Sequence, residues 1–173
     1  MYKRSEGFFK GHKGNLNFHQ AWENPKARGS ILITHGQGEH SDCYQRLIDF
    51  FKDDLWNFYG WDLRGHGRSE GKRGYAENFN DYLLDYKIFL KTLFENKIKT
   101  GPVVLLSHSM GGLIQLKFMT EDFNPASYPL IKAQVCSGPL LGVGVPVPKI
   151  KDLGAEVLAR YLPQLTLWNE ITN

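Results

Sequence analysis

The sequence is poor in the features that mark several classes of protein. It contains two cysteines, Cys43 and Cys136, whose separation matches neither a metal-binding motif nor a disulfide framework. No run approaches the ~20 apolar residues that a membrane-spanning helix needs. The polar start of the chain lacks the apolar core of a secretion signal. We therefore expect a cytoplasmic protein in which both cysteines are small packing residues.

The chain also has no large excess of positive or negative charge. The 21 Lys and Arg residues nearly balance the 18 Asp and Glu residues, for a formal net charge of +3. The basic residues are scattered, which gives little support to nucleic-acid binding. A peripheral contact with an anionic membrane surface stays open, although an ordinary solvated surface is the better explanation.

The chain does contain alternating strand and helix patterns. Residues 7–22 have a turn at 11–15 and predict an antiparallel hairpin. Further along, short apolar runs predict buried strands, and apolar residues three and four apart predict helices. The strands are expected at 30–34, 56–61, 103–106 and 131–136, and the helices at 79–94, at 110–119 and after a cap at Ser41. This alternation predicts an α/β domain with a doubly wound, mostly parallel sheet.

One serine lies directly between an apolar strand and a helix. Ser109 on a tight turn there would project its hydroxyl above the sheet, and the start of the helix would favour a developing oxyanion. Such a turn needs small residues two before and two after the serine, and Ser107 and Gly111 stand there. Ser107 replaces the first glycine of the usual Gly-x-Ser-x-Gly pattern. We predict that Ser109 is a nucleophile and that His108 is a neighbouring wall residue.

A glycine-rich loop, residues 35–41, follows the first buried strand. With Ser109 as nucleophile, the expected oxyanion donors are the backbone N–H groups of Met110 and of Gln37 in this loop. Gly36 and Gly38 would let the backbone turn toward a substrate carbonyl oxygen.

Neither glycine-rich loop has the pattern of a metal site or of a phosphate-binding loop. His35, Glu39 and His40 match no known metal signature, so we expect no metal there. Residues 62–69 form a second loop that lacks the Gly-Lys-Ser/Thr ending of a phosphate-binding loop. We expect this second loop to be structural, with its aspartate and arginine paired locally.

Together these motifs resemble those of the monoacylglycerol lipase and lysophospholipase group of α/β-hydrolases. The similar segments are 35–41, 62–69 with 71–75, 107–112 and 137–141. The resemblance implies an α/β-hydrolase core over 1–139 and the beginning of a hydrophobic cap over 140–173. It also implies hydrolysis of a single-chain acyl ester through an acyl-serine intermediate, without metal or organic cofactor. Ser109 matches the nucleophile, and Gln37 and Met110 match the oxyanion donors.

The resemblance leaves the rest of a catalytic triad unassigned. In this architecture an acid and then a histidine follow the serine, and this sequence has no histidine after His108. We therefore expect the final strands to be missing, the chain to end inside the cap, and the isolated chain to have little or no turnover. An exposed edge of the shortened sheet would favour self-association.

Three functions remain open at this point. The first is an ester hydrolase for monoacylglycerol or lysophospholipid, and the second a carboxylesterase for small soluble esters. The third is a non-catalytic module that binds lipid or another partner. Epoxide hydrolase and dehalogenase chemistry is disfavoured, because those enzymes need an aspartate where Ser109 stands.

Overall fold

A computed structural model of the chain describes residues 2–51, 53–142, 155, 158 and 160–162. The chain divides into two compact units, Met1–Leu141 and Gly142–Asn173. The hydrolase-like motifs all belong to the first unit. Most of the predicted cap lies outside the described residues; of its predicted helix around 153–162, residues 155, 158, 160 and 161 are described and are helical. The boundary at 139 between core and cap therefore stays a prediction.

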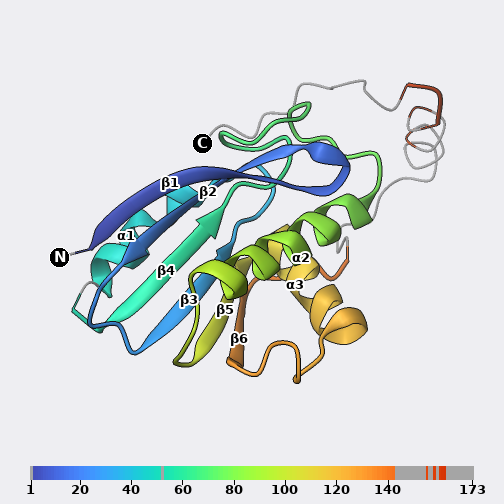
Figure 1. The fold of residues 1–173 in the computed structure, drawn as a ribbon. Helices are drawn as coiled ribbons and strands as arrows, with labels where there is room; N and C mark the ends of the chain where they lie inside the picture. The colour runs from blue at the N-terminus through green and yellow to red at the C-terminus, as the bar shows by residue number, and fades with distance from the viewer. Residues whose placement is uncertain (1, 52, 143–154, 156–157, 159, 163–173) are drawn as a thin grey trace. The chain divides into compact units, whose positions relative to one another are not determined.

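The first unit is built on one six-stranded sheet in the order β1-β2-β4-β3-β5-β6 (Figure 1). The pairs β1–β2 and β2–β4 are antiparallel, whereas β4, β3, β5 and β6 run parallel to one another. The strands are β1 (Lys3–Lys10), β2 (Leu16–Glu23), β3 (Gly29–Thr34), β4 (Trp56–Trp61), β5 (Val103–His108) and β6 (Ile131–Ser137). The predicted hairpin and the predicted parallel strands are confirmed.

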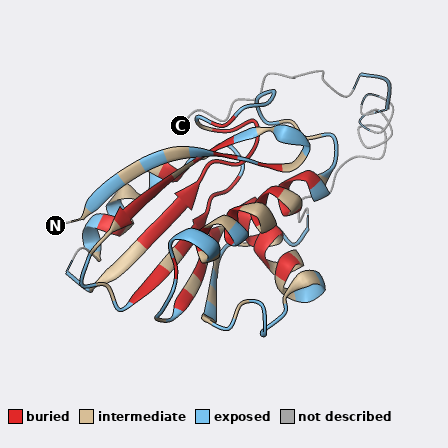
Figure 2. Ribbon diagram, viewed as in Figure 1, coloured by how far each residue is buried: buried red, intermediate tan, exposed pale blue. Residues whose placement is uncertain are grey.

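Helices cover both faces of this sheet, as a doubly wound arrangement requires. On one face Leu32 and Tyr59 join a core cluster with α2 (Phe79–Asn96) and α3 (Ser109–Lys117). The residue adjacent to each of these in its strand faces the other way, since Ile33 and Phe58 pack with α1 (Gln45–Phe50). Side chains of a strand alternate between faces, so β3 and β4 are buried on both sides (Figure 2).

Two helix boundaries differ from the predictions. Ser41 does not cap α1; it begins a short 3-10 helix, η2 (Ser41–Tyr44), and its hydroxyl donates to Asp62 Oδ1 at 2.6 Å. The predicted helix through Met119 ends as an α-helix at Lys117 and continues as one π-helical turn, η3 (Phe118–Asp122). A further 3-10 turn, η1 (His12–Gly14), joins β1 to β2. At Ser41 the outcome is decided by Asp62, a partner distant in the sequence.

The strand β6 is last in the sheet order, so its outer edge has no strand partner among the described residues. Val135 in this strand leaves half of its surface, 50%, exposed. Self-association through this edge stays a prediction. In the part of the chain that is described, no helix has both the length and the apolar character to cross a membrane.

Candidate active site

Strand β5 ends at His108 and α3 begins at the very next residue, Ser109. No loop separates them, so the chain must reverse within one residue. Ser109 accordingly adopts a left-handed backbone conformation with a φ of 47°. A side chain other than glycine pays roughly 1–2 kcal/mol for that conformation. Strained residues of this kind cluster at active sites, and a strained strand-to-helix serine is the geometry of a nucleophile elbow.

Close packing explains the glycine two residues after the serine. A Cβ atom on Gly111 would lie 2.3 Å from the carbonyl oxygen of Thr34 and 2.5 Å from that of His35. Crowding at this position therefore comes from the end of β3. Ser107 is buried, and its hydroxyl makes a long hydrogen bond of 3.5 Å to the Val135 carbonyl oxygen of β6. A serine is thus accommodated where the usual pattern has glycine.

The glycine-rich loop after β3 packs directly on the elbow. A Cβ atom on Gly36 would lie 3.0 Å from Ser109 Cβ. Gln37 follows, and its N–H forms no hydrogen bond with another described residue. Met110 is the second residue of α3, so its N–H has no acceptor within the helix. The segments that carry both predicted oxyanion donors therefore meet at Ser109.

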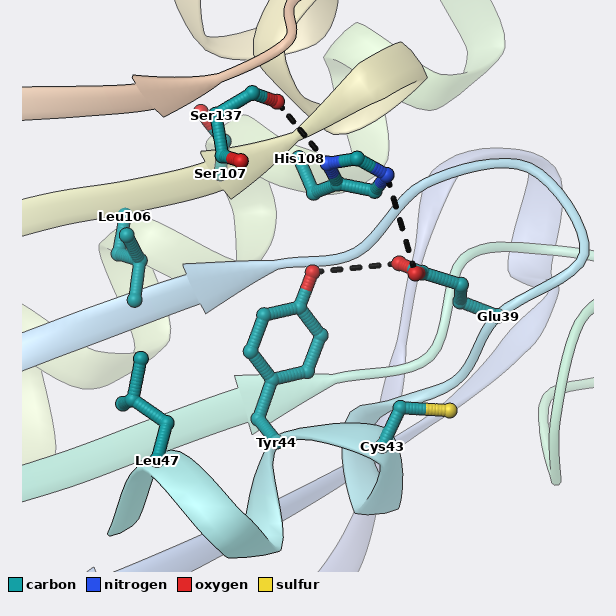
Figure 3. A pocket seen from close by; sticks show the side chains of 8 residues that line it. All are labelled: Glu39, Cys43, Tyr44, Leu47, Leu106, Ser107, His108 and Ser137. Carbon is teal, nitrogen blue, oxygen red and sulfur yellow. Dashed lines mark hydrogen bonds and ion pairs between the residues drawn. The ribbon is translucent and has the colours of Figure 1, made fainter. Parts of the chain in front are cut away.

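A pocket of about 260 Å³ opens beside the elbow (Figure 3). Its polar end holds His108 and Glu39, and Tyr44 lines it from η2. The His108 Nδ1 atom lies 2.9 Å from the carbonyl oxygen of Ser137, and its Nε2 atom lies 3.9 Å from Glu39 Oε1. His108 lines this pocket beside the elbow. Glu39 and Tyr44 line it as well, and they could not be predicted at the site because neither belongs to the elbow motif.

The buried His35 is fully occupied by the backbone. Its Nδ1 atom donates to the Gly36 carbonyl oxygen at 2.7 Å, and its Nε2 atom accepts the Leu63 N–H at 2.9 Å. Burial lowers the pKa of His35 from 6.5 to about 4, so the ring is neutral near pH 7. Neither nitrogen has a free lone pair for a metal. Within the described ranges, no three His, Cys, Asp or Glu side chains gather closely enough to hold one.

The second glycine-rich loop connects neighbouring parts of the fold. Its aspartate and arginine do not pair with each other, contrary to the prediction. Asp62 accepts hydrogen bonds from the N–H and the hydroxyl of Ser41 and from the N–H of Arg68. Arg64 forms a bidentate ion pair with the buried Asp85 of α2, with Nε–Oδ2 and Nη2–Oδ1 distances of 2.7 and 2.9 Å.

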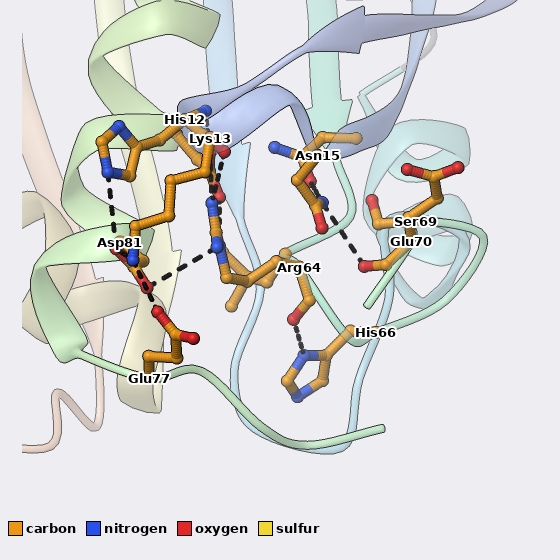
Figure 4. Close-up of polar contacts among 12 residues, drawn as sticks. His12, Lys13, Asn15, Arg64, His66, Ser69, Glu70, Glu77 and Asp81 are labelled. Atoms are coloured by element: carbon orange, nitrogen blue, oxygen red, sulfur yellow. Dashed lines mark hydrogen bonds and ion pairs between the residues drawn. The ribbon is translucent and has the colours of Figure 1, made fainter. Parts of the chain in front are cut away.

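Around this ion pair, further polar groups attach the β1–β2 turn to α2 (Figure 4). The N–H of His12 donates to Asp85 Oδ1 at 2.7 Å, and Arg64 Nη2 donates to the His12 carbonyl oxygen at 3.1 Å. Lys13 Nζ lies 2.7 Å from Glu77 Oε2. This network fixes the loop after β4 and the β1–β2 turn to α2. None of its residues lines the pocket next to the elbow.

Fold and elbow together define the class as α/β-hydrolase, and comparison with known proteins identifies the family. Residues 25–173 match the family described as serine aminopeptidase, S33. The chain belongs to this α/β-hydrolase family.

Two curated relatives have about the same identity. The phospholipase YtpA of Bacillus subtilis is 30% identical over 146 residues, which cover 83% of this chain and 53% of the relative. The monoacylglycerol lipase of Mycolicibacterium smegmatis is 30% identical over 167 residues, which cover 96% of this chain and 58% of the relative. The chain thus spans somewhat more than half the length of these relatives.

Solved structures show the same fold. The monoacylglycerol lipase of Paleococcus ferrophilus aligns with a TM-score of 0.61 at 26% identity, covering 99% of this chain and 56% of that one. A soluble variant of the Saccharomyces cerevisiae monoglyceride lipase aligns with a TM-score of 0.69 at 24% identity, covering 95% and 53%. The α/β-hydrolase architecture predicted from the motifs is therefore confirmed.

Proposed function

We propose that this chain provides the nucleophile and the oxyanion donors of a serine ester hydrolase acting on monoacylglycerol or lysophospholipid. The observation that carries the proposal is the left-handed backbone of Ser109 at the junction of β5 and α3, in contact with the Gly36 loop. The substrate class is supported by the relatives, which are named as a phospholipase and monoacylglycerol lipases. The family description names an aminopeptidase, but no named relative above is a peptidase.

In the proposed first step, Ser109 Oγ attacks the carbonyl carbon of the ester and gives up its proton to a general base. The carbonyl oxygen takes the negative charge, which the N–H groups of Gln37 and Met110 and the start of α3 stabilise. Collapse of this intermediate expels the alcohol, which regains a proton, and leaves the acyl group on Ser109. Water then attacks the acyl-serine by the same route and releases the fatty acid.

Neither histidine near Ser109 is available as the general base. His35 uses both ring nitrogens on backbone groups, and His108 directs its nitrogens at Ser137 and Glu39. We therefore propose that the 173-residue chain alone has little or no turnover. Cytoplasmic residence and a peripheral membrane contact remain predictions from the sequence.

Adding a base to the solution tests directly whether Ser109 is a nucleophile that lacks its general base. Imidazole in solution can replace a missing histidine, so we expect hydrolysis of p-nitrophenyl butyrate to require added imidazole and to vanish in Ser109→Ala. The difference between wild type and Ser109→Ala corrects for hydrolysis by imidazole itself. Mass spectrometry should detect a butyryl group on Ser109. Steady Ser109-dependent turnover without imidazole would contradict the proposed inactivity, and absence of acylation with imidazole would contradict the nucleophile.

A non-catalytic lipid-binding module is the second candidate, and the engagement of both His35 and His108 favours it. This candidate predicts saturable binding of a fatty acid without any Ser109-dependent acylation. Isothermal titration with oleate, run beside the imidazole experiment, separates the two. The carboxylesterase alternative is distinguished by the acyl length that gives the fastest acylation.

A further inference from the structure

Glu39 connects the three segments that surround Ser109 (Figure 3). Its Oε2 atom accepts the N–H of Gly36 at 2.9 Å and the hydroxyl of Tyr44 at 3.2 Å. Its Oε1 atom lies 3.9 Å from His108 Nε2. One carboxylate thus touches the loop after β3, the 3-10 helix that follows, and the residue directly before the nucleophile.

The first of these contacts closes a tight turn. The N–H of Glu39 donates to the Gly36 carbonyl oxygen at 3.3 Å, while the Glu39 carboxylate accepts the Gly36 N–H. Gly38 has a φ of 77°, which a type II turn requires at its third residue. Both backbone groups of Gly36 are therefore bound to Glu39, and Gln37 lies inside the closed turn.

The contact with His108 fastens this turn to the elbow. A carbonyl oxygen can only accept, so His108 Nδ1 must carry the hydrogen that it donates to Ser137. His108 Nε2 then faces the Glu39 carboxylate and forms an ion pair with it whenever the ring is protonated. The protonated side chain of His108 thereby links the end of β6 to the turn of Gly36 and Glu39.

Tyr44 completes the arrangement as a neutral donor. Burial raises the pKa of the Tyr44 hydroxyl, and the negative charge of Glu39 raises it further. The phenol therefore keeps its proton and donates to the carboxylate at neutral pH. This donor is the last residue of η2, so Glu39 is held by a second element besides the end of β5.

We propose that Glu39 is a positioning residue, which fixes the Gly36–Glu39 turn against the elbow so that the Gln37 N–H is directed at the oxyanion. The inference rests on the proposed function. Gly36 is close enough to Ser109 for a Cβ atom to meet Ser109 Cβ at 3.0 Å, so any movement of the turn changes the distance from Gln37 to the reacting carbonyl. A misplacement of about 1 Å can lower a rate roughly 10²-fold.

Amide hydrogen exchange by NMR on the 173-residue chain tests whether Glu39 holds the turn. We expect Glu39→Ala to speed exchange of the Gly36 amide at least roughly tenfold, because it loses a charged acceptor. Glu39→Gln keeps a neutral acceptor, so it should preserve protection at Gly36 but shift the ring-nitrogen signals of His108. Glu121→Gln, which alters an exposed ion pair with Lys117, is the matched control and should change neither signal. Unchanged Gly36 exchange in Glu39→Ala overturns the inference.

The imidazole-dependent acylation of Ser109 then tests the effect on chemistry. We expect Glu39→Ala to lower the maximal acylation rate about 10²-fold, which is the effect of losing one oxyanion donor. The ester concentration that gives half of the maximal rate should change little. Glu39→Gln should fall between this variant and wild type, and it carries the test alone if Glu39→Ala does not fold. Equal acylation of wild type, Glu39→Gln and Glu121→Gln overturns the positioning role. Failure of wild type to be acylated overturns the proposed function instead, and the exchange result still stands.

Discussion

The loops that follow β3 and β4 look alike in sequence but differ in how their polar groups are used. Both contain at least one histidine and two glycines, and both begin at the same edge of the sheet because β3 and β4 are parallel. In the loop after β4, Asp62 and Arg64 bind Ser41, Arg68 and Asp85. In the loop after β3, Gln37 keeps an N–H that no described residue accepts. We therefore expect the loop after β3 to serve function through the Gln37 N–H, and the contacts of Asp62 and Arg64 in the loop after β4 to serve stability.

The largest expected effect comes from breaking the loop after β4. Asp85→Ala removes the bidentate partner of the Arg64 guanidinium, whose side chain is 10% exposed, and leaves only the longer 3.6 Å ion pair with Asp81. Removing one member of a buried ion pair costs about 3–5 kcal/mol of unfolding free energy. Urea denaturation would measure the loss. Glu121→Ala removes an exposed ion pair and should stay within about 0.5 kcal/mol, and a similar small loss in Asp85→Ala would contradict this account.

The loop after β3 should give the protein a pH-dependent stability. Burial lowers the pKa of His35 from 6.5 to about 4, so between these values the unfolded chain binds the proton and the folded chain does not. The stability that neutral His35 contributes is complete above pH 6.5 and is lost as the pH falls toward 4, about 3 kcal/mol in all. Urea midpoints at several pH values would show it. His35→Gln should flatten the curve and leave the slope from His66 and His19, whose pKa values burial also lowers.

Close contact between the elbow and β3 predicts a smaller effect. Gly111→Ala forces a Cβ against the carbonyl oxygens of Thr34 and His35 and should cost about 1–3 kcal/mol. Gly142→Ala is the matched control, because a Cβ there would meet no atom within 4 Å. Thermal unfolding of the two variants measures the difference. Equal melting temperatures would show that α3 does not press against the end of β3.

The smallest expected effect has the opposite sign. Ser109→Gly removes the strain of a left-handed serine and should stabilise the chain by about 1 kcal/mol. Ser109→Ala retains the Cβ atom and therefore the strain, so its unfolding free energy should match that of wild type. Both variants lack the hydroxyl and should lose imidazole-dependent acylation. A destabilised Ser109→Gly would mean that the elbow is not strained.

The elements of the fold were predictable because their signals are local. Apolar runs predicted β3, β4, β5 and β6 within one or two residues. For β3 and β4 the reason is that strands buried on both faces need continuous apolar sequence, whereas β6 has no buried residue. The prediction that Ser41 caps a helix was wrong because the Ser41 hydroxyl binds Asp62, a residue 21 positions away. Local propensity contains no information about a partner so distant in the sequence.

The site was predictable only in part, for the same reason. The position of Ser109 followed from a strand that meets a helix without a loop. The contacts of Glu39 with Gly36, Tyr44 and His108 depend on how three segments pack, and no spacing in the sequence indicates them. The pairing of Arg64 with Asp85 of α2 likewise required the three-dimensional structure.

The buried Ser107 has a practical consequence for finding similar proteins. A text search for Gly-x-Ser-x-Gly would pass over this chain, although Ser109 has the backbone shape that the pattern was written to capture. At position 107 the fold accommodates a small side chain, whose hydroxyl here reaches the Val135 carbonyl oxygen, and at position 111 it leaves no room for a Cβ atom. Screens for such hydrolases should therefore admit serine at the first position and stay strict at the last.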